Sequence, residues 1–183
     1  MLYCHTSALL KLYIEEGHSD RLKSEVAQAH PVAVCRIAWV EAQAAPARRA
    51  REVPEDRPVI EAAIAALTTD WPHCLMLEVN QSVVERAGDY ADTFALNGYD
   101  SLQLAAPFEA GQIAETIVDF ACFDVRLNNA AEVLAMRAPY SNFRNSTWTK
   151  PNSTGSPTSS GTSPTTCCAT CSSGASTAMS SCP

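Results

Sequence analysis

The stretch MLYCHTSALLKLY, residues 1–13, decides the fold because its hydrophobic pattern changes within a few positions. Residues 1–4 form a short run of bulky, mainly apolar side chains, which predicts a buried β-strand. Thr6 or Ser7 then supplies a helix N-cap, and the apolar residues in 9–14 fall on one face of the helix that follows. This stretch therefore predicts a strand that leads directly into a helix.

Strand-like and helix-like segments continue to alternate up to residue 138. Further strands are expected at 31–35, 74–79 and 116–122, and helices at 19–29, 37–51, 58–69, 81–94, 99–110 and 124–136. Pro46 and Pro107 are expected to kink or interrupt their helices. Strands separated by helices pair in parallel through right-handed crossovers. The sequence therefore predicts an α/β fold, a three-layer α/β/α sandwich around a short, mostly parallel sheet.

The composition changes abruptly after Ala138. Residues 139–183 contain no Asp or Glu and are rich in Ser, Thr, Pro and Cys. A segment of this kind buries too little apolar surface to offset the entropy that ordering would cost. We therefore expect one domain over residues 1–138 and a disordered tail over 139–183. The cysteines of the tail are candidates for disulfides or for zinc binding, although their spacing fits a zinc site poorly.

The charge balance is acidic, with a formal net charge of −7 at pH 7. This argues against non-specific affinity for nucleic acid, which depends on Lys and Arg replacing counterions at phosphates. It does not exclude a nuclease, because bound divalent cations turn an acidic cleft into one that binds phosphate. No apolar run approaches the length of a membrane span, and no secretory signal is recognisable, so we expect a cytoplasmic protein.

Four segments resemble, in the right order, the motifs of PIN-domain ribonucleases of the VapC toxin type: residues 1–13, 36–42, 98–106 and 120–127. Each match is weak alone, and together they cover roughly the first three quarters of the chain. The resemblance implies a PIN-like fold and a metal-dependent endoribonuclease that acts as the toxin of a toxin–antitoxin pair. It also implies Mg²⁺ or Mn²⁺ as the cofactor.

The resemblance assigns catalysis and metal binding to three carboxylates, Glu41, Asp100 and Asp124. Phosphodiester hydrolysis develops negative charge on several oxygens, and hard cations held by carboxylates and water stabilise this charge. Each acid also has an ordinary explanation. Glu41 would then be a solvated helix residue, and Asp100 and Asp124 would be helix caps.

His5 stands where the family has its first aspartate. An imidazole suits Mn²⁺ or Zn²⁺ better than Mg²⁺, so His5 is a further candidate metal ligand; the alternative is that it hydrogen-bonds to neighbouring acids. Either case predicts weak Mg²⁺-dependent cleavage. Thr6 and Cys122 lie beside site positions and are candidates for orienting the ligands. Asp119 is expected to face solvent on an edge strand rather than to join the site.

Arg48, Arg49 and Arg126 are candidate contacts to RNA phosphates, with a solvated helix face as the alternative explanation for the first two. The family resemblance further implies a VapB-like antitoxin that covers the active site, and a homodimer. It implies an RNA substrate, with structured RNA such as tRNA among the candidates.

Two other functions compete with an active toxin. One is a catalytically impaired PIN domain that binds an antitoxin or RNA, which His5, the two helix prolines and the unusual tail favour. The other is an unrelated α/β domain whose acids are caps and surface charges. Metal-dependent RNA cleavage separates the first possibility from an active enzyme, and a divalent ion bound among the three carboxylates excludes the second.

Overall fold

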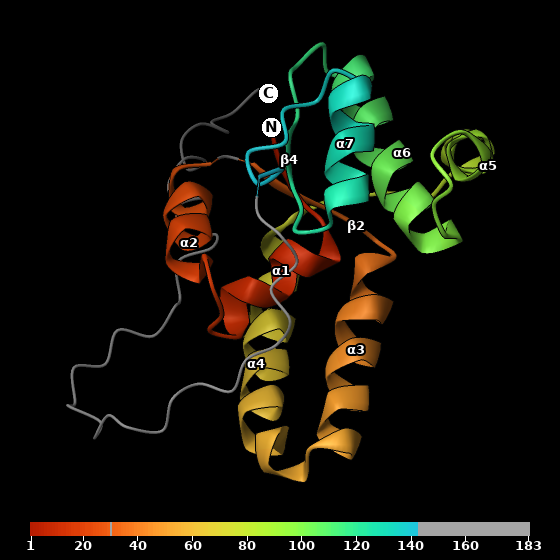
Figure 1. Ribbon diagram of the computed structural model, residues 1–183. Helices are drawn as coiled ribbons and strands as arrows, with labels where there is room; N and C mark the ends of the chain where they lie inside the picture. Colours follow the sequence, from red (N-terminus) through yellow and green to blue (C-terminus); the bar gives the residue numbers. More distant parts are fainter. Residues whose placement is uncertain (30, 143–183) are drawn as a thin grey trace, which may run out of the picture.

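The computed structural model describes residues 1–29 and 31–142, and within these residues the chain forms four strands and seven α-helices (Figure 1). The strands are β1 (Leu2–Cys4), β2 (Val32–Cys35), β3 (Leu75–Leu77) and β4 (Asp119–Ala121). The α-helices are α1 (Thr6–Tyr13), α2 (Ser19–Gln28), α3 (Ala38–Glu52), α4 (Arg57–Asp70), α5 (Gln81–Thr93), α6 (Gly98–Ile113) and α7 (Val125–Val133), with short 3₁₀ turns at Pro54–Asp56 and Trp71–His73. No helix in this part of the chain is long and apolar enough to cross a membrane.

The four strands form one parallel sheet in the order β3-β2-β1-β4. In this register Leu2 of β1 pairs with Val32 on one side and Asp119 on the other. Because all strands run the same way, their first residues share one edge of the sheet, the amino edge. The residues that follow them share the opposite edge, the carboxyl edge.

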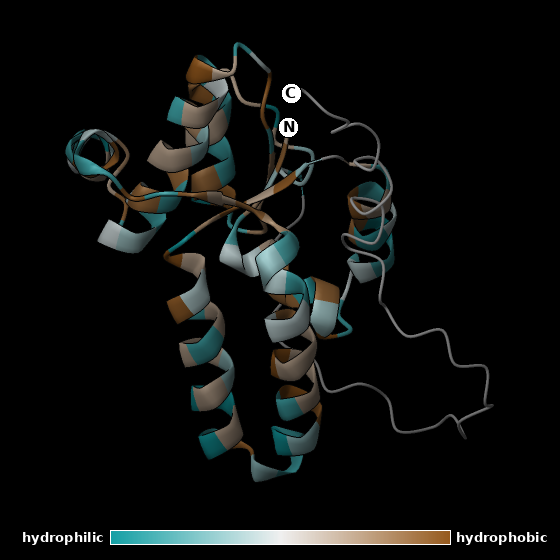
Figure 2. Cartoon of the chain, turned by 180° about the vertical axis from the view of Figure 1, so that it is seen from behind, coloured by the Kyte–Doolittle hydropathy of each residue, from teal (hydrophilic) through white to brown (hydrophobic). Residues whose placement is uncertain are grey.

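Helices cover both faces of the sheet, because successive side chains of a strand point to opposite faces. Tyr3 packs with residues of α5, α6 and α7, whereas Leu2 and Cys4 pack with residues of α1, α2 and α3. Figure 1 shows the same two groups of helices on either side of the strands. Figure 2 shows from behind that the strands between them are largely hydrophobic. The α/β/α sandwich with a short parallel sheet is therefore confirmed.

Two local expectations need correction: neither proline interrupts its helix, and α1 is capped by a residue other than the two expected. Helices α3 and α6 continue through Pro46 and Pro107 without interruption. A proline in a helix removes one backbone donor, and here both prolines are buried, so packing outweighs this cost. The N-cap of α1 is His5, not Thr6 or Ser7, because the imidazole accepts a hydrogen bond from the Ser7 backbone amide.

The packed part of the chain extends past the expected boundary at residue 138. After α7, Arg137 forms an isolated parallel bridge with Asp119, so the chain runs beside β4 toward the carboxyl edge. It reaches Tyr140, whose side chain is completely buried and whose ring lies 4.7 Å from that of Phe123. The domain therefore includes Tyr140, and the rest of the expected tail, residues 143–183, lies outside the described part of the chain.

Candidate functional site

His5 lies at the carboxyl edge, directly after β1, and is 6% exposed. Its backbone amide donates a 3.0 Å hydrogen bond to Ala121 at the end of β4. Its Nδ1 accepts a hydrogen bond from the Ser7 amide at 3.2 Å and lies 3.0 Å from the Ser7 hydroxyl. These contacts fix the ring at the point where β1, β4 and α1 meet.

The other ring nitrogen of His5 faces an acid. Nε2 lies 3.4 Å from Oδ1 of Asp100 and is buried without a well-formed hydrogen bond to any described residue. When Nδ1 accepts from the Ser7 amide, the neutral ring carries its proton on Nε2, toward Asp100. Burial lowers the pKa of His5, but Cys122 and the Asp100 carboxylate raise it by a larger amount. The resulting pKa of His5 is about 10. His5 thus meets Asp100 as a proton donor, with a tendency toward positive charge.

Glu41 lies in the first turn of α3 and is held by neutral donors. The Thr6 hydroxyl donates to Glu41 Oε2 at 2.7 Å, and the Gln103 amide nitrogen donates to the same oxygen. Gln103 is completely buried, and its carbonyl accepts from the Tyr3 hydroxyl at 3.2 Å and from the Thr6 backbone amide at 3.1 Å. The network links β1, α1, α3 and α6 to the Glu41 carboxylate.

Sequence analysis did not single out Gln103, although it lies inside one of the four motifs. The available signal was a polar side chain in the otherwise apolar run 102–106. Such a residue needs hydrogen-bond partners when it is buried. The sequence does not reveal that these partners come from residues 62 to 100 positions away.

Of the two acids that could have been helix caps, Asp124 is one, whereas the N-cap of α6 is Asn97, whose side chain accepts from the Asp100 backbone amide at 2.9 Å. Asp124 is the N-cap of α7, and its Oδ1 accepts from the amides of Arg126 at 2.8 Å and Leu127 at 3.3 Å. Asp100 lies in the first turn of α6, where its Oδ2 accepts from the Asn97 side chain at 2.6 Å. A capping role and a site role are compatible, because each carboxylate has two oxygens.

His5, Asp100 and Asp124 come together around one hollow of about 340 Å³, which we call the carboxylate hollow. Its lining residues are His5, Ser7, Leu10, Lys11, Glu16, Asp100, Phe123 and Asp124. Glu41 is not part of this lining; it accepts a hydrogen bond from Thr6, which stands between the lining residues His5 and Ser7 in the sequence. Sequence analysis placed no function on Lys11 or Glu16, which lie in the first strand–helix unit and the loop after it.

Cys122 lies beneath the hollow, where it packs against two of its residues. Its Sγ accepts from the Asp124 backbone amide at 3.3 Å and lies 3.6 Å from the Ser7 hydroxyl. The side chain is completely buried. Cys122 therefore contacts the segments that carry Asp124 and His5.

The donor chemistry suits a hard cation, although the side chains do not converge on one. Glu41 uses Oε2 and Asp124 uses Oδ1 for the contacts above, and the second oxygen of each accepts no hydrogen bond from a described residue. Carboxylate oxygens are the ligands that Mg²⁺ and Mn²⁺ prefer. In residues 1–29 and 31–142, however, no three His, Cys, Asp or Glu side chains have the arrangement of a metal site.

The three arginines proposed to contact RNA lie around the carboxylate hollow rather than in it. Arg48 and Arg49 line a neighbouring hollow of about 280 Å³ between α1 and α3. Arg49 pairs with Asp56 at 2.9 Å, and the exposed Arg48 lies 3.7 Å from Glu52. The exposed Arg126 lies 4.0 Å from Asp124 Oδ1.

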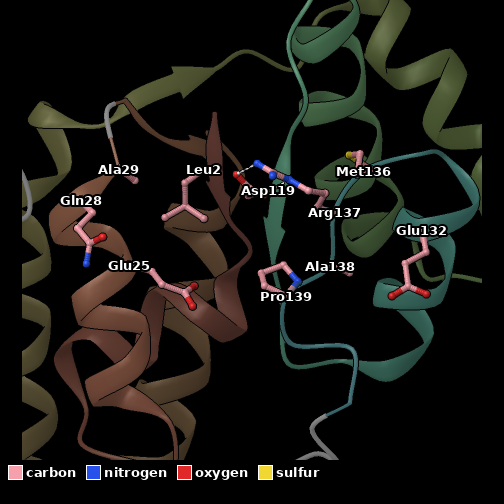
Figure 3. A pocket seen from close by; sticks show the side chains of 10 residues that line it. All are labelled: Leu2, Glu25, Gln28, Ala29, Asp119, Glu132, Met136, Arg137, Ala138 and Pro139. Carbon is pink, nitrogen blue, oxygen red and sulfur yellow. Dashed lines mark hydrogen bonds and ion pairs between the residues drawn. The ribbon is translucent and has the colours of Figure 1, made fainter.

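A different hollow lies at the amino edge, between α2 and the segment after α7 (Figure 3). Its lining includes Leu2, Glu25, Asp119, Glu132 and Arg137, and the pair of Asp119 with Arg137 at 2.6 Å crosses it. Asp119 is the first residue of the edge strand β4, whereas Asp124 follows the other end of that strand. Asp119 therefore does not contribute to the carboxylate hollow.

No family model matches the sequence, and no curated protein matches it at a significant level. The functional interpretation therefore depends on the four motifs and on the chemistry of the residues that the fold brings to the carboxyl edge.

Proposed function

We propose that this protein is a metal-dependent endoribonuclease of the VapC-type PIN-domain class, the toxin of a toxin–antitoxin pair, with activity weakened by His5. One observation carries the proposal. The four motif segments, far apart in sequence, meet at the carboxyl edge: His5, Asp100 and Asp124 line one hollow, and Glu41 accepts a hydrogen bond from Thr6, the residue after His5. In open parallel sheets this edge is where ligands bind.

Glu41, Asp100 and Asp124 would hold Mg²⁺ or Mn²⁺, with His5 as a further candidate ligand. When bound, the cation would stabilise the negative charge that develops on the phosphodiester oxygens during hydrolysis. Thr6, Gln103 and Cys122 would keep the carboxylates in position through the contacts described above.

The partners of the proposed toxin follow from the family resemblance alone. They are a VapB-like antitoxin, a second copy of the chain in a homodimer, and an RNA substrate such as tRNA. A cytoplasmic location belongs to the same proposal.

A specific observation favours one alternative, an impaired PIN domain that binds RNA or an antitoxin. His5 Nε2 lies 3.4 Å from Asp100, and the pKa of His5 is raised to about 10. A positive charge beside one of the proposed ligands repels a cation and competes for that carboxylate. This arrangement lowers metal affinity without disturbing the rest of the fold.

The decisive test is cleavage of total RNA by the full chain with Mg²⁺ or Mn²⁺. Asp100→Asn keeps the size of the side chain and removes its charge. We expect it to reduce cleavage by at least about 100-fold, or about 2.7 kcal/mol of barrier. Asp119→Asn is the matched control, because it makes the same change at the amino edge, and it should leave cleavage unchanged.

The possible outcomes separate the alternatives. Cleavage that is equally sensitive to both substitutions would argue against the proposed site. RNA binding without metal-dependent cleavage would favour the impaired domain. Absence of both cleavage and RNA binding would contradict the nuclease and the RNA-binding alternative together.

A further inference from the structure

Lys11 is a buried cation inside the carboxylate hollow. It projects from α1, its side chain is 5% exposed, and its Nζ lies 4.9 Å from the centre of the Phe123 ring. Lysine is among the residues that are least often buried, because removing its charge from water is costly. The position of Lys11 therefore requires an anion close to Nζ.

The anion in this structure is Glu16, from the loop between α1 and α2. Its carboxylate pairs with Lys11 Nζ, and its side chain is 15% exposed. The Glu16 backbone amide donates to the Ser19 hydroxyl at 3.0 Å, which fastens the loop to the start of α2. A carboxylate on a short loop thus fills an anion position in the lining of the same hollow as Asp100 and Asp124.

Glu16 also lies where two hollows meet. Leu10 and Glu16 line both the carboxylate hollow and the neighbouring hollow that contains Arg48 and Arg49. Glu16 therefore lies at the boundary between the carboxylate hollow, which contains Lys11, and the neighbouring hollow, which contains Arg48 and Arg49.

We propose that Lys11 binds a backbone phosphate of an RNA strand, and that Glu16 occupies this phosphate position when RNA is absent. The inference rests on the proposed function for the identity of the ligand. Two features favour a phosphodiester group: a buried amine donates strongly to an anionic oxygen, and the hollow that adjoins at Glu16 is lined by two arginines, Arg48 and Arg49. Glu16 would then act as an internal competitor that RNA displaces.

The same loop provides a matched control pair. Glu15, the neighbour of Glu16, pairs with Lys23 of α2 at 2.5 Å, and both side chains are exposed, by 59% and 37%. Glu15→Gln and Lys23→Gln therefore alter the net charge in the same way as Glu16→Gln and Lys11→Gln. They do so outside both hollows.

The experiment measures binding of a short fluorescent single-stranded RNA to the full chain by anisotropy, in EDTA so that no cleavage occurs. Lys11→Gln should weaken binding about tenfold, the equivalent of one charge-assisted hydrogen bond. It should also reduce the slope of log Kd against log salt by about 0.7, the value for one single-strand phosphate contact. Glu16→Gln should tighten binding several-fold, because the competitor is removed. Glu15→Gln and Lys23→Gln should change binding much less.

The inference would be overturned if the substitutions of Lys11 and Glu16 changed RNA affinity no more than those of Lys23 and Glu15. Absence of RNA binding by the unaltered chain would also overturn it. Binding of inorganic phosphate without binding of RNA would overturn the assignment to RNA. If Lys11→Gln does not fold, as judged by circular dichroism, Glu16→Gln decides the outcome alone. Because binding is measured without metal, a chain that binds RNA as expected but never cleaves it would refute the nuclease and leave the Lys11 site standing.

Discussion

The two edges of the sheet hold their acids in opposite ways. At the amino edge, Asp119 is neutralised by Arg137, at 2.6 Å and in contact with solvent. At the carboxyl edge, Glu41 receives hydrogen bonds from the uncharged Thr6 and Gln103, and Asp124 receives them from backbone amides. Neutral donors fix a carboxylate without cancelling its charge. The comparison indicates that Glu41 and Asp124 keep more of their negative charge than Asp119 does, although Arg126 lies 4.0 Å from Asp124 Oδ1.

His5 is the exception at the carboxyl edge. It is the one group in the lining of the carboxylate hollow that approaches Asp100 as a proton donor with a raised pKa. In this respect the pair of His5 and Asp100 resembles the pair of Arg137 and Asp119 at the other edge. His5, which stands where the resembled motif has an aspartate, is therefore also a local departure from the electrostatics of the edge.

The largest expected effect concerns the segment that connects the two edges. Ending the chain after Ala138 removes Tyr140, which is completely buried and donates to Glu25 at 2.6 Å. We expect this truncation to lower the free energy of unfolding by about 3–5 kcal/mol, as for loss of a large buried aromatic side chain. Chemical denaturation measures it. A chain ending after Asn142 is the control and should keep the stability of the full chain, whereas equal loss in both would show that later residues contribute.

The buried network at the carboxyl edge gives the next effect. Gln103→Leu removes the partner of Tyr3, Thr6 and Glu41 at once, and buried polar groups without partners are costly. We expect a loss of about 2–4 kcal/mol in the free energy of unfolding. Gln112→Leu, an exposed position on the same helix, should change it by less than about 0.5 kcal/mol.

The amino edge provides the contrast to this result. Asp119→Asn breaks a pair whose side chains are 30% and 64% exposed, and such pairs contribute at most about 1 kcal/mol. Asp119→Asn should therefore destabilise the protein less than Gln103→Leu does. Equal losses would contradict the distinction between the exposed ion pair at the amino edge and the buried network at the carboxyl edge.

The sequence was sufficient for the fold because hydrophobic periodicity is local. The strand at residues 2–4, its helix and the order of the later elements follow from patterns of apolar residues, and parallel pairing follows from their alternation. The boundary was missed because Tyr140 lies in a polar segment, where one aromatic residue carries no periodic signal. The continuity of α3 through Pro46 was missed because propensity does not include the packing of a buried proline.

The candidate site could be predicted in its outline but not in its contacts. Motif order nominated Glu41, Asp100 and Asp124, and the parallel topology brings Asp100 and Asp124 to one hollow whose lining does not include Glu41. The position of Gln103 under Glu41 and of Glu16 on Lys11 depends on side-chain packing between elements distant in sequence or on the course of a loop. No local pattern encodes either.

The last expected effect is on activity rather than stability: His5→Asp tests whether the pairing of His5 with Asp100 is what makes the carboxyl edge resemble the amino edge. The substitution removes a proton donor from Asp100 and adds an anionic oxygen ligand, so the charge of the hollow becomes more negative by at least one unit. A hard cation such as Mg²⁺ should then bind more tightly. We expect Mg²⁺-dependent RNA cleavage to rise at least about tenfold, which corresponds to about 1.4 kcal/mol. His5→Asn is the matched control, because it removes the imidazole without adding a charge, and it should recover less of the activity. If the only effect were that Asp100 loses its contact with His5, His5→Asp and His5→Asn would cleave RNA equally fast. If His5→Asp and the unaltered chain had the same Mg²⁺-dependent activity, His5 would not limit the site.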